Sequence, residues 1–115
     1  MLPQVPPAQL NDWLTQHSSG SDALPLVLDV REPWEVAQAS VRPEGFELRC
    51  IPMGEIPSRL QELDPDHPTA CLCHHGERSM HVAAFLMNNG FETVANISGG
   101  IDAWSRERDP GVPRY

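Results

Sequence analysis

The sequence predicts an α/β protein in which a central parallel sheet of about five strands is flanked by helices, a doubly wound arrangement. Two nearly continuous apolar runs, 24–30 and 70–73, have the composition of strands buried on both faces. Helical patterns alternate with such runs at short spacing along the chain, which is typical of parallel sheets. The 12 prolines add a third observation. None lies between Pro68 and Pro110, so the most regular structure is expected there.

The first half of the chain alternates short strands and helices. Pro7 and Pro33 are each expected in the first turn of a helix, where no backbone N–H donor is needed. Trp34 and Val36 are expected to pack inward from the second helix. In the segment 48–52, side chains alternate until a proline ends the strand. The predicted elements are a strand from Val5, a helix over 8–17, a loop over 18–22, a strand over 24–30, a helix over 32–37, a strand over 48–52 and a helix over 53–63.

The second half is organised around the segment 69–89, in which a strand, a tight loop and a helix follow one another. The apolar run 70–73 predicts the strand, and apolar residues at i, i+3, i+4 and i+7 predict a helix that begins at Ser79. Gly90 caps the C-terminus of this helix. The remaining predicted elements are a strand over 91–97, a turn over 98–100, a helix over 101–108 and a tail over 110–115.

Cys73 ends the strand predicted over 70–73 and precedes the helix. Ligands of open α/β sheets bind at this end of the strands. The first N–H groups of the helix have no intrahelical partner, and its dipole adds partial positive charge. Both effects favour a thiolate, the nucleophilic form of cysteine. Gly76 lets the loop adopt conformations that a side chain would forbid, and its presence with Arg78 and Ser79 argues against a merely buried cysteine.

Composition and charge exclude several classes of function. The 8 basic residues, all of them arginine, and 16 acidic residues give a net charge of −8, which disfavours nucleic acid and anionic membranes as partners. Three cysteines form no even disulfide framework, so a reducing compartment is expected. The N-terminus lacks the basic and apolar regions of a signal peptide, and no run reaches the ~20 apolar residues of a membrane span. We expect a cytoplasmic monomer with one domain over 1–115.

Four segments, taken together, resemble the single-domain rhodaneses. In chain order they are LDVREPWE at 28–35, IPMGEIP at 51–57, CHHGERS at 73–79 and GGIDAW at 99–104. The resemblance extends from about Val5 to the end of the sequence. It implies a parallel α/β fold and a sulfurtransferase that carries a sulfane sulfur on a cysteine persulfide, without a bound metal or cofactor.

The resemblance also implies roles for individual residues. Cys73 would attack the outer sulfur of a donor such as thiosulfate, and cyanide, a cellular thiol or a partner protein would accept the sulfur. Asp29 and Arg31 match the family's acid–arginine pair and would support the site, although a structural ion pair is the favoured interpretation. The active-site loop would consist of His74, His75, Gly76, Glu77, Arg78 and Ser79.

Several loop residues have alternative roles. Arg78 either holds the oxyanion of the donor or braces the loop against the fold. Many family members have a neutral or basic residue where Glu77 stands, so an acid here should repel thiosulfate and favour a protein persulfide or a less charged thiol. The segment 40–50 also departs from the family pattern. A protonated His74 or His75 would stabilise the thiolate, whereas the loop could instead turn both rings to solvent.

Three other functions fit parts of the pattern. One is a persulfide carrier or docking module in a sulfur relay, which would turn small donors over poorly. Another is a phosphatase or arsenate reductase of related fold, but those loops have one residue more than the four that separate Cys73 from Arg78. The third is a metal site, which neighbouring residues cannot easily close into a tetrahedron; its ligands would be Cys71, Cys73, His74 and His75. Both Cys50 and Cys71 are instead expected to pack within their strands.

Overall fold

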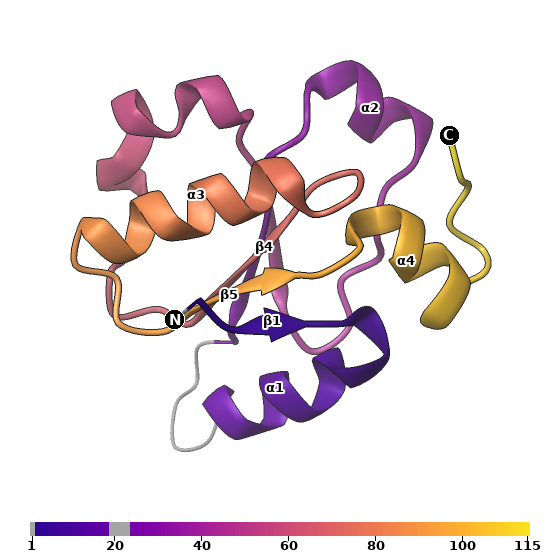
Figure 1. Cartoon of the computed structure of the whole chain (residues 1–115), viewed down its shortest axis with the longest axis horizontal. Coiled ribbons are helices and arrows are strands. Elements are labelled where there is room, and N and C mark those ends of the chain that lie inside the picture. The colour runs from indigo at the N-terminus through magenta and orange to yellow at the C-terminus, as the bar shows by residue number, and fades with distance from the viewer. Residues whose placement is uncertain (1, 19–23) are drawn as a thin grey trace.

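The strands of the computed structural model form one five-stranded sheet in the order β1-β5-β4-β2-β3, and all neighbouring strands are parallel (Figure 1). The structure describes residues 2–18 and 24–115. The strands are β1 (Gln4–Val5), β2 (Leu26–Asp29), β3 (Glu47–Cys50), β4 (Thr69–Leu72) and β5 (Val94–Ile97). Because β4 is the central strand, its carboxyl end lies between the ends of its neighbours β5 and β2.

Helices cover both faces of this sheet, so the predicted doubly wound α/β fold is confirmed. The helical elements are η1 (Pro7–Gln9), α1 (Leu10–Ser18), α2 (Pro33–Gln38), η2 (Met53–Glu55), η3 (Pro57–Glu62), α3 (Glu77–Asn88) and α4 (Gly100–Glu107). Alternate side chains of β4 point to opposite faces. Ala70 and Leu72 enter a core with residues of α1 and α4, whereas Cys71 enters a core with residues of α3.

The segment expected as one helix over 53–63 is two short 3₁₀ helices. Pro57 opens the second of them and has no N–H group with which to continue the first. Arg59 also leaves helical geometry, with φ −115° and ψ 15°. In the central segment, α3 begins at Glu77, earlier than the expected Ser79, and its C-terminus is followed by Gly90 with φ 90°, as predicted.

Two predictions about packing are wrong. Trp34 is 62% exposed, and α2 buries Glu35 in its place. Val36, which the sequence also predicts to pack inward, is only partly buried. Cys50 is exposed, because it ends β3 at the edge of the sheet. Ser18 is the last residue of α1, and the rest of the loop expected over 18–22 lies outside the described residues.

None of the helices in residues 2–18 and 24–115 is both long and apolar enough to cross a lipid bilayer.

Candidate active site

Cys73 follows β4 directly and lies at the carboxyl end of the central strand. Its side chain is almost completely buried, with 1% exposed. The backbone then turns to Gly76, which has a φ of 103° and immediately precedes α3. The positive φ favours glycine, and a β-carbon at Gly76 would also make a tight contact, 3.1 Å from the backbone nitrogen of Gly99.

Two donors of the loop are directed at the Cys73 sulfur. The backbone N–H of Gly76 donates a hydrogen bond to Sγ over 3.1 Å, and the Ser79 hydroxyl lies 3.3 Å from Sγ. Both groups are buried, which strengthens their interaction with a negatively charged sulfur. The loop can therefore stabilise a thiolate or a persulfide anion at this position.

The N-terminus of α4 supports the loop from the side opposite α3. The N–H of Ile101 donates to the carbonyl oxygen of Cys73 over 2.8 Å, and the N–H of Asp102 donates to that of His74 over 3.1 Å. These otherwise unpartnered helix donors fix the direction of two loop carbonyls. The approach is close because Gly100, the first residue of α4, has no side chain.

Arg78 braces the loop against α2, which is one of the two roles that the sequence suggested for it. Its terminal nitrogens bond both carboxylate oxygens of Glu35, over 2.6 and 2.7 Å. The Tyr115 hydroxyl donates to the same carboxylate over 2.7 Å, and Arg31 donates to that hydroxyl over 3.1 Å. The network joins three regions that are far apart in the sequence. It leaves Arg78 already partnered when a donor arrives.

Asp29 and Arg31 form a buried bidentate pair at the end of β2. Arg31 Nη2 lies 2.6 Å from Asp29 Oδ2, and Nε lies 2.9 Å from Oδ1. The guanidinium also donates to the carbonyl oxygens of Glu35 and Ala39. These contacts hold α2 against the sheet, which agrees with the favoured structural interpretation of the pair. Arg31 is linked to the brace on Arg78 through the Tyr115 hydroxyl and the Glu35 carbonyl oxygen.

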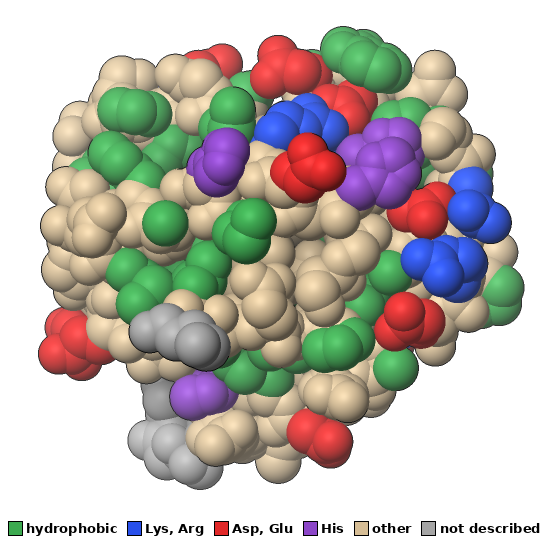
Figure 2. Space-filling view, in the orientation of Figure 1, with side chains coloured by type: hydrophobic (Ala, Val, Ile, Leu, Met, Phe, Trp, Pro, Cys, Tyr) green, Lys and Arg blue, Asp and Glu red, His purple; other side chains and the backbone are tan. Residues whose placement is uncertain are grey.

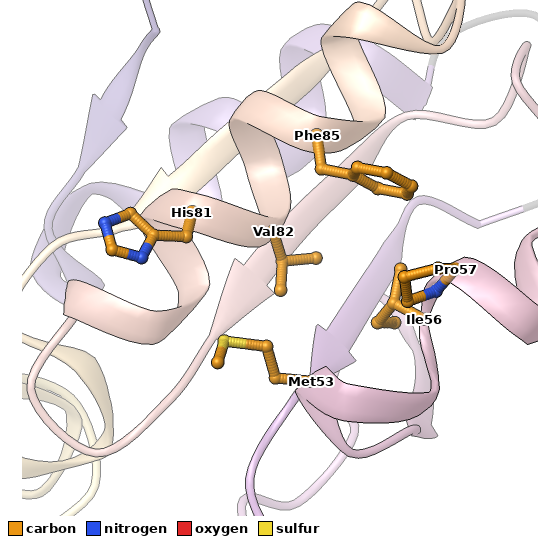
Figure 3. A pocket seen from close by; sticks show the side chains of 6 residues that line it. All are labelled: Met53, Ile56, Pro57, His81, Val82 and Phe85. Atoms are coloured by element: carbon orange, nitrogen blue, oxygen red, sulfur yellow. The ribbon is translucent and has the colours of Figure 1, made fainter.

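The loop encloses a polar hollow of about 150 Å³, which is lined by Cys73, His74, His75, Glu77 and Arg78. In Figure 2, histidine, acidic and basic side chains gather over the start of α3. A second hollow of about 180 Å³ lies between α3 and the 3₁₀ helices (Figure 3) and is lined by Met53, Ile56, Pro57, His81, Val82 and Phe85. It is apolar apart from the histidine, and its lining includes no cysteine or serine, so we place the chemistry at the polar hollow.

Comparison with known proteins identifies the family. The family model of the rhodanese-like domain matches residues 10–107. The chain belongs to the rhodanese-like family. A protein of Allochromatium vinosum named sulfurtransferase is 39% identical over 87 residues, which are 76% of this chain and 78% of that protein. This relationship supports sulfur transfer of the rhodanese type over the phosphatase and arsenate reductase alternatives.

Other rhodanese-like proteins are similar to this chain in structure or in sequence. The crystal structure of a rhodanese-related protein from Thermoplasma volcanium superposes with a TM-score of 0.74 at 28% identity, covering 98% of this chain and 99% of that one. A rhodanese-like/PpiC domain-containing chloroplastic protein of Arabidopsis thaliana is 41% identical over 93 residues. The match covers 77% of this chain but only 30% of the plant protein, so this chain spans under a third of that relative.

The two histidines of this rhodanese-like loop form part of an aromatic stack. The His74 ring lies 4.0 Å from the ring of Tyr115 and 3.9 Å from that of His75, in nearly parallel planes. Burial, and secondarily the charge of His75, lowers the pKa of His74, which disfavours its imidazolium form. This shift disfavours the stabilisation of the thiolate by His74 that the sequence suggested. His75 is exposed, as the alternative interpretation expected.

The other cysteines lie outside the hollow. Cys71 is buried in β4, as predicted, and burial raises the pKa of its thiol. In the part of the chain that the structure describes, no three histidine, cysteine, aspartate or glutamate side chains are grouped so that they could hold a metal ion.

Sequence reasoning missed three residues around the loop. Glu35 and Tyr115 complete the brace on Arg78, and Asn96 of β5 hydrogen-bonds the Ser79 hydroxyl. Glu35 lies three residues after Glu32 in a capping-box pattern, which is a signal for a helix start rather than for a site. Tyr115 is the single tyrosine of the sequence, and no local pattern around it predicts its contacts.

Acid should weaken the rhodanese-like fold through Glu35. Its hydrogen bonds with Arg78 lower the pKa of this buried carboxyl from 4.5 to about 2. A folded-state pKa below the unfolded value stabilises the fold above the unfolded pKa, and this contribution is lost as pH falls from about 4.5 to 2. We expect up to about 3 kcal/mol of the free energy of unfolding to disappear in this window. Urea unfolding at a series of pH values measures it.

Glu35→Gln provides the comparison for this pH dependence. Glutamine retains the shape and one acceptor but cannot titrate. The variant should be less stable at pH 7 and should lose less stability than the wild type on acidification. An identical dependence on pH in the two proteins would show that Glu35 does not carry the effect.

Proposed function

We propose that this protein is a sulfurtransferase that carries a sulfane sulfur on Cys73 as a persulfide. The observation that carries the proposal is the pair of buried donors, the Gly76 N–H and the Ser79 hydroxyl, directed at Sγ beside the polar hollow. A persulfide and a thiolate are both anions, and preorganised donors stabilise both. Membership of the rhodanese-like family supports the same reaction.

The transfer consists of two displacements at sulfur and needs no bound cofactor. The Cys73 thiolate attacks the outer sulfur of the donor, a new S–S bond forms, and the donor's own bond to that sulfur breaks with the electron pair on the leaving group. With thiosulfate the leaving group is sulfite. A thiophilic acceptor then attacks the outer sulfur of the persulfide, and Cys73 leaves as a thiolate. With cyanide the product is thiocyanate, and with a thiolate it is a new persulfide.

Charges around the hollow favour a thiol persulfide over thiosulfate as the donor. Among the residues that the structure describes, Arg78 is the only arginine that lines the hollow, and each of its terminal nitrogens donates to Glu35, which balances its charge. Glu77 lines the same hollow and is exposed. A thiosulfate dianion would meet a carboxylate and a guanidinium whose charge Glu35 already balances, whereas a persulfide on an otherwise uncharged thiol carries at most one negative charge and would meet weaker repulsion.

Removing the charge of Glu77 should therefore raise the efficiency of transfer from thiosulfate selectively. Glu77→Gln is expected to raise kcat/KM for thiosulfate roughly fivefold, which corresponds to about 1 kcal/mol of repulsion. The kcat/KM for the persulfide of 2-mercaptoethanol should change less than twofold. The measurement is steady-state thiocyanate formation with each donor in excess cyanide. Glu92→Gln, which neutralises an exposed glutamate outside the hollow, is the matched control. If Glu77→Gln and Glu92→Gln change kcat/KM for thiosulfate equally, the charge of Glu77 does not determine which donor is used.

The same assay distinguishes an enzyme from a persulfide carrier. Both load Cys73 in the first displacement. An enzyme then turns over repeatedly with cyanide and a small donor, whereas a carrier releases one equivalent and reloads only from a protein donor. We expect repeated turnover with the persulfide of 2-mercaptoethanol, and a single equivalent of thiocyanate would favour the carrier.

A further inference from the structure

The Ser79 hydroxyl lies between two groups that can both accept its proton. Its oxygen is 3.3 Å from Cys73 Sγ and 2.5 Å from Asn96 Oδ1. Ser79 and Asn96 are 0% and 2% exposed, so both groups lie in the protein interior. A serine hydroxyl has one proton and can donate it to only one of the two at a time.

The orientation of the Asn96 amide is fixed by its other contacts. Its Nδ2 donates to the backbone carbonyl oxygen of Gly76 over 3.1 Å and to the side-chain oxygen of Gln4 over 2.9 Å. A backbone carbonyl can only accept, so Nδ2 must face Gly76 and Oδ1 must face Ser79. Asn96 therefore presents an acceptor to the hydroxyl, at a shorter distance than the sulfur does.

These contacts give the two ionisation states of Cys73 different hydrogen bonds. When Cys73 is a thiol, Ser79 donates to Asn96 and its oxygen can accept the weak S–H donor, so all three groups are partnered. When Cys73 is a thiolate or persulfide anion, the hydroxyl turns toward Sγ and the buried Oδ1 of Asn96 loses its donor. A buried acceptor without a donor is unfavourable. Asn96 thus opposes the anionic form, while Gly76 N–H favours it.

We propose that Asn96 is a positioning residue that competes with Cys73 for the Ser79 proton and so sets the pH at which the sulfur becomes reactive. The competition keeps the anionic sulfur less fully hydrogen-bonded, and an anion with weaker hydrogen bonds is the stronger nucleophile. The inference rests on Cys73 being the reactive thiol of the proposed function. Its test uses iodoacetamide and no sulfur donor, so it can fail while sulfur transfer stands.

The test is the pH profile of Cys73 alkylation, followed by peptide mass spectrometry that separates Cys73 from Cys50 and Cys71. Asn96→Ala should move the midpoint of the profile down by roughly half a pH unit, because the Ser79 proton becomes free for the thiolate. Ser79→Ala should move it up by a similar amount. The double variant Ser79→Ala/Asn96→Ala should have the same midpoint as Ser79→Ala alone, because there is no longer a Ser79 proton for which Asn96 and Cys73 compete.

A merely structural role of Asn96 predicts another pattern. The same shift with and without Ser79, or no shift with Ser79 present, would overturn the proposal. If Asn96→Ala does not fold, Asn96→Asp keeps the acceptor toward Ser79 and strengthens it with a negative charge, while the Ser79→Ala background controls for the lost Nδ2 donor to Gly76 and Gln4. This variant should move the midpoint up by more in the presence of Ser79 than in its absence, and equal shifts in the two backgrounds would contradict the competition.

Discussion

Gly100→Ala should unfold the active-site loop and strongly destabilise the protein. The added β-carbon would lie 2.5 Å from the carbonyl oxygen of Cys73 and against that of His74 as well. Backbone atoms cannot move aside as a flexible side chain does, and the φ of 60° at Gly100 is unfavourable for alanine. We expect a loss of about 3 kcal/mol in the free energy of unfolding. Urea denaturation measures the loss, and sulfur transfer should fall at least tenfold.

Gly54→Ala is the matched control for this substitution. A β-carbon added at Gly54 would meet no heavy atom within 4 Å among the described residues beyond its chain neighbours, and Gly54 does not have a positive φ. Its replacement should change stability by less than about 0.5 kcal/mol. If Gly100→Ala behaves in the same way, the close approach of α4 to the Cys73 loop does not hold the loop in place.

Arg31→Met should cost about 3 to 5 kcal/mol, because it leaves the Asp29 carboxylate buried without its partner. Both side chains of the pair are at most 1% exposed. The substitution also removes the donors to the Ala39 carbonyl and to the Tyr115 hydroxyl, so α2 and the aromatic stack should loosen. Thermal and urea unfolding measure the stability, and the near-ultraviolet circular dichroism of the aromatic residues reports the stack.

Two further variants separate the stability lost with the ion pair from the stability lost with the packing of the arginine side chain. Arg49→Met removes an arginine from the half-exposed pair with Glu62, and it should cost at most about 1 kcal/mol. Adding Asp29→Asn to Arg31→Met removes the unpaired charge and should restore part of the lost stability. If the double variant is no more stable than Arg31→Met alone, the uncompensated charge is not the cause.

The fold was predictable because its signals are local. The apolar strands, the proline-free interval and the strand–loop–helix around Cys73 each lie within a short segment. The wrong predictions also have physical causes. The apolar character of Trp34 predicts a core position, but the bonds of Glu35 with Arg78 and Tyr115 turn the other face of α2 inward. The sequence predicts a packed position for Cys50 because it does not show that β3 is an edge strand.

The candidate site was predictable only where the loop itself carries it. Cys73, Gly76, Arg78 and Ser79 stand at fixed offsets in one segment. The partners that decide their roles come from elsewhere, since Glu35 and Tyr115 are 80 residues apart and Asn96 is 17 residues from Ser79. No periodicity or spacing links such residues, and only the folded sheet brings them together. This is why the sequence left the role of Arg78 open, and why its contact with Glu35 became apparent only in the folded structure.

The persulfide on Cys73 is the central claim, and intact mass spectrometry tests it most directly. Wild type and Cys73→Ser are incubated with thiosulfate or with the persulfide of 2-mercaptoethanol, freed of donor and weighed before and after cyanide. We predict that wild type gains the mass of one sulfur atom, with fuller loading from the persulfide, and loses it to cyanide as thiocyanate, whereas Cys73→Ser gains nothing. A sulfur that still loads on Cys73→Ser would place the chemistry on another cysteine, with the exposed Cys50 as the first candidate, and would contradict the site assigned at the end of β4.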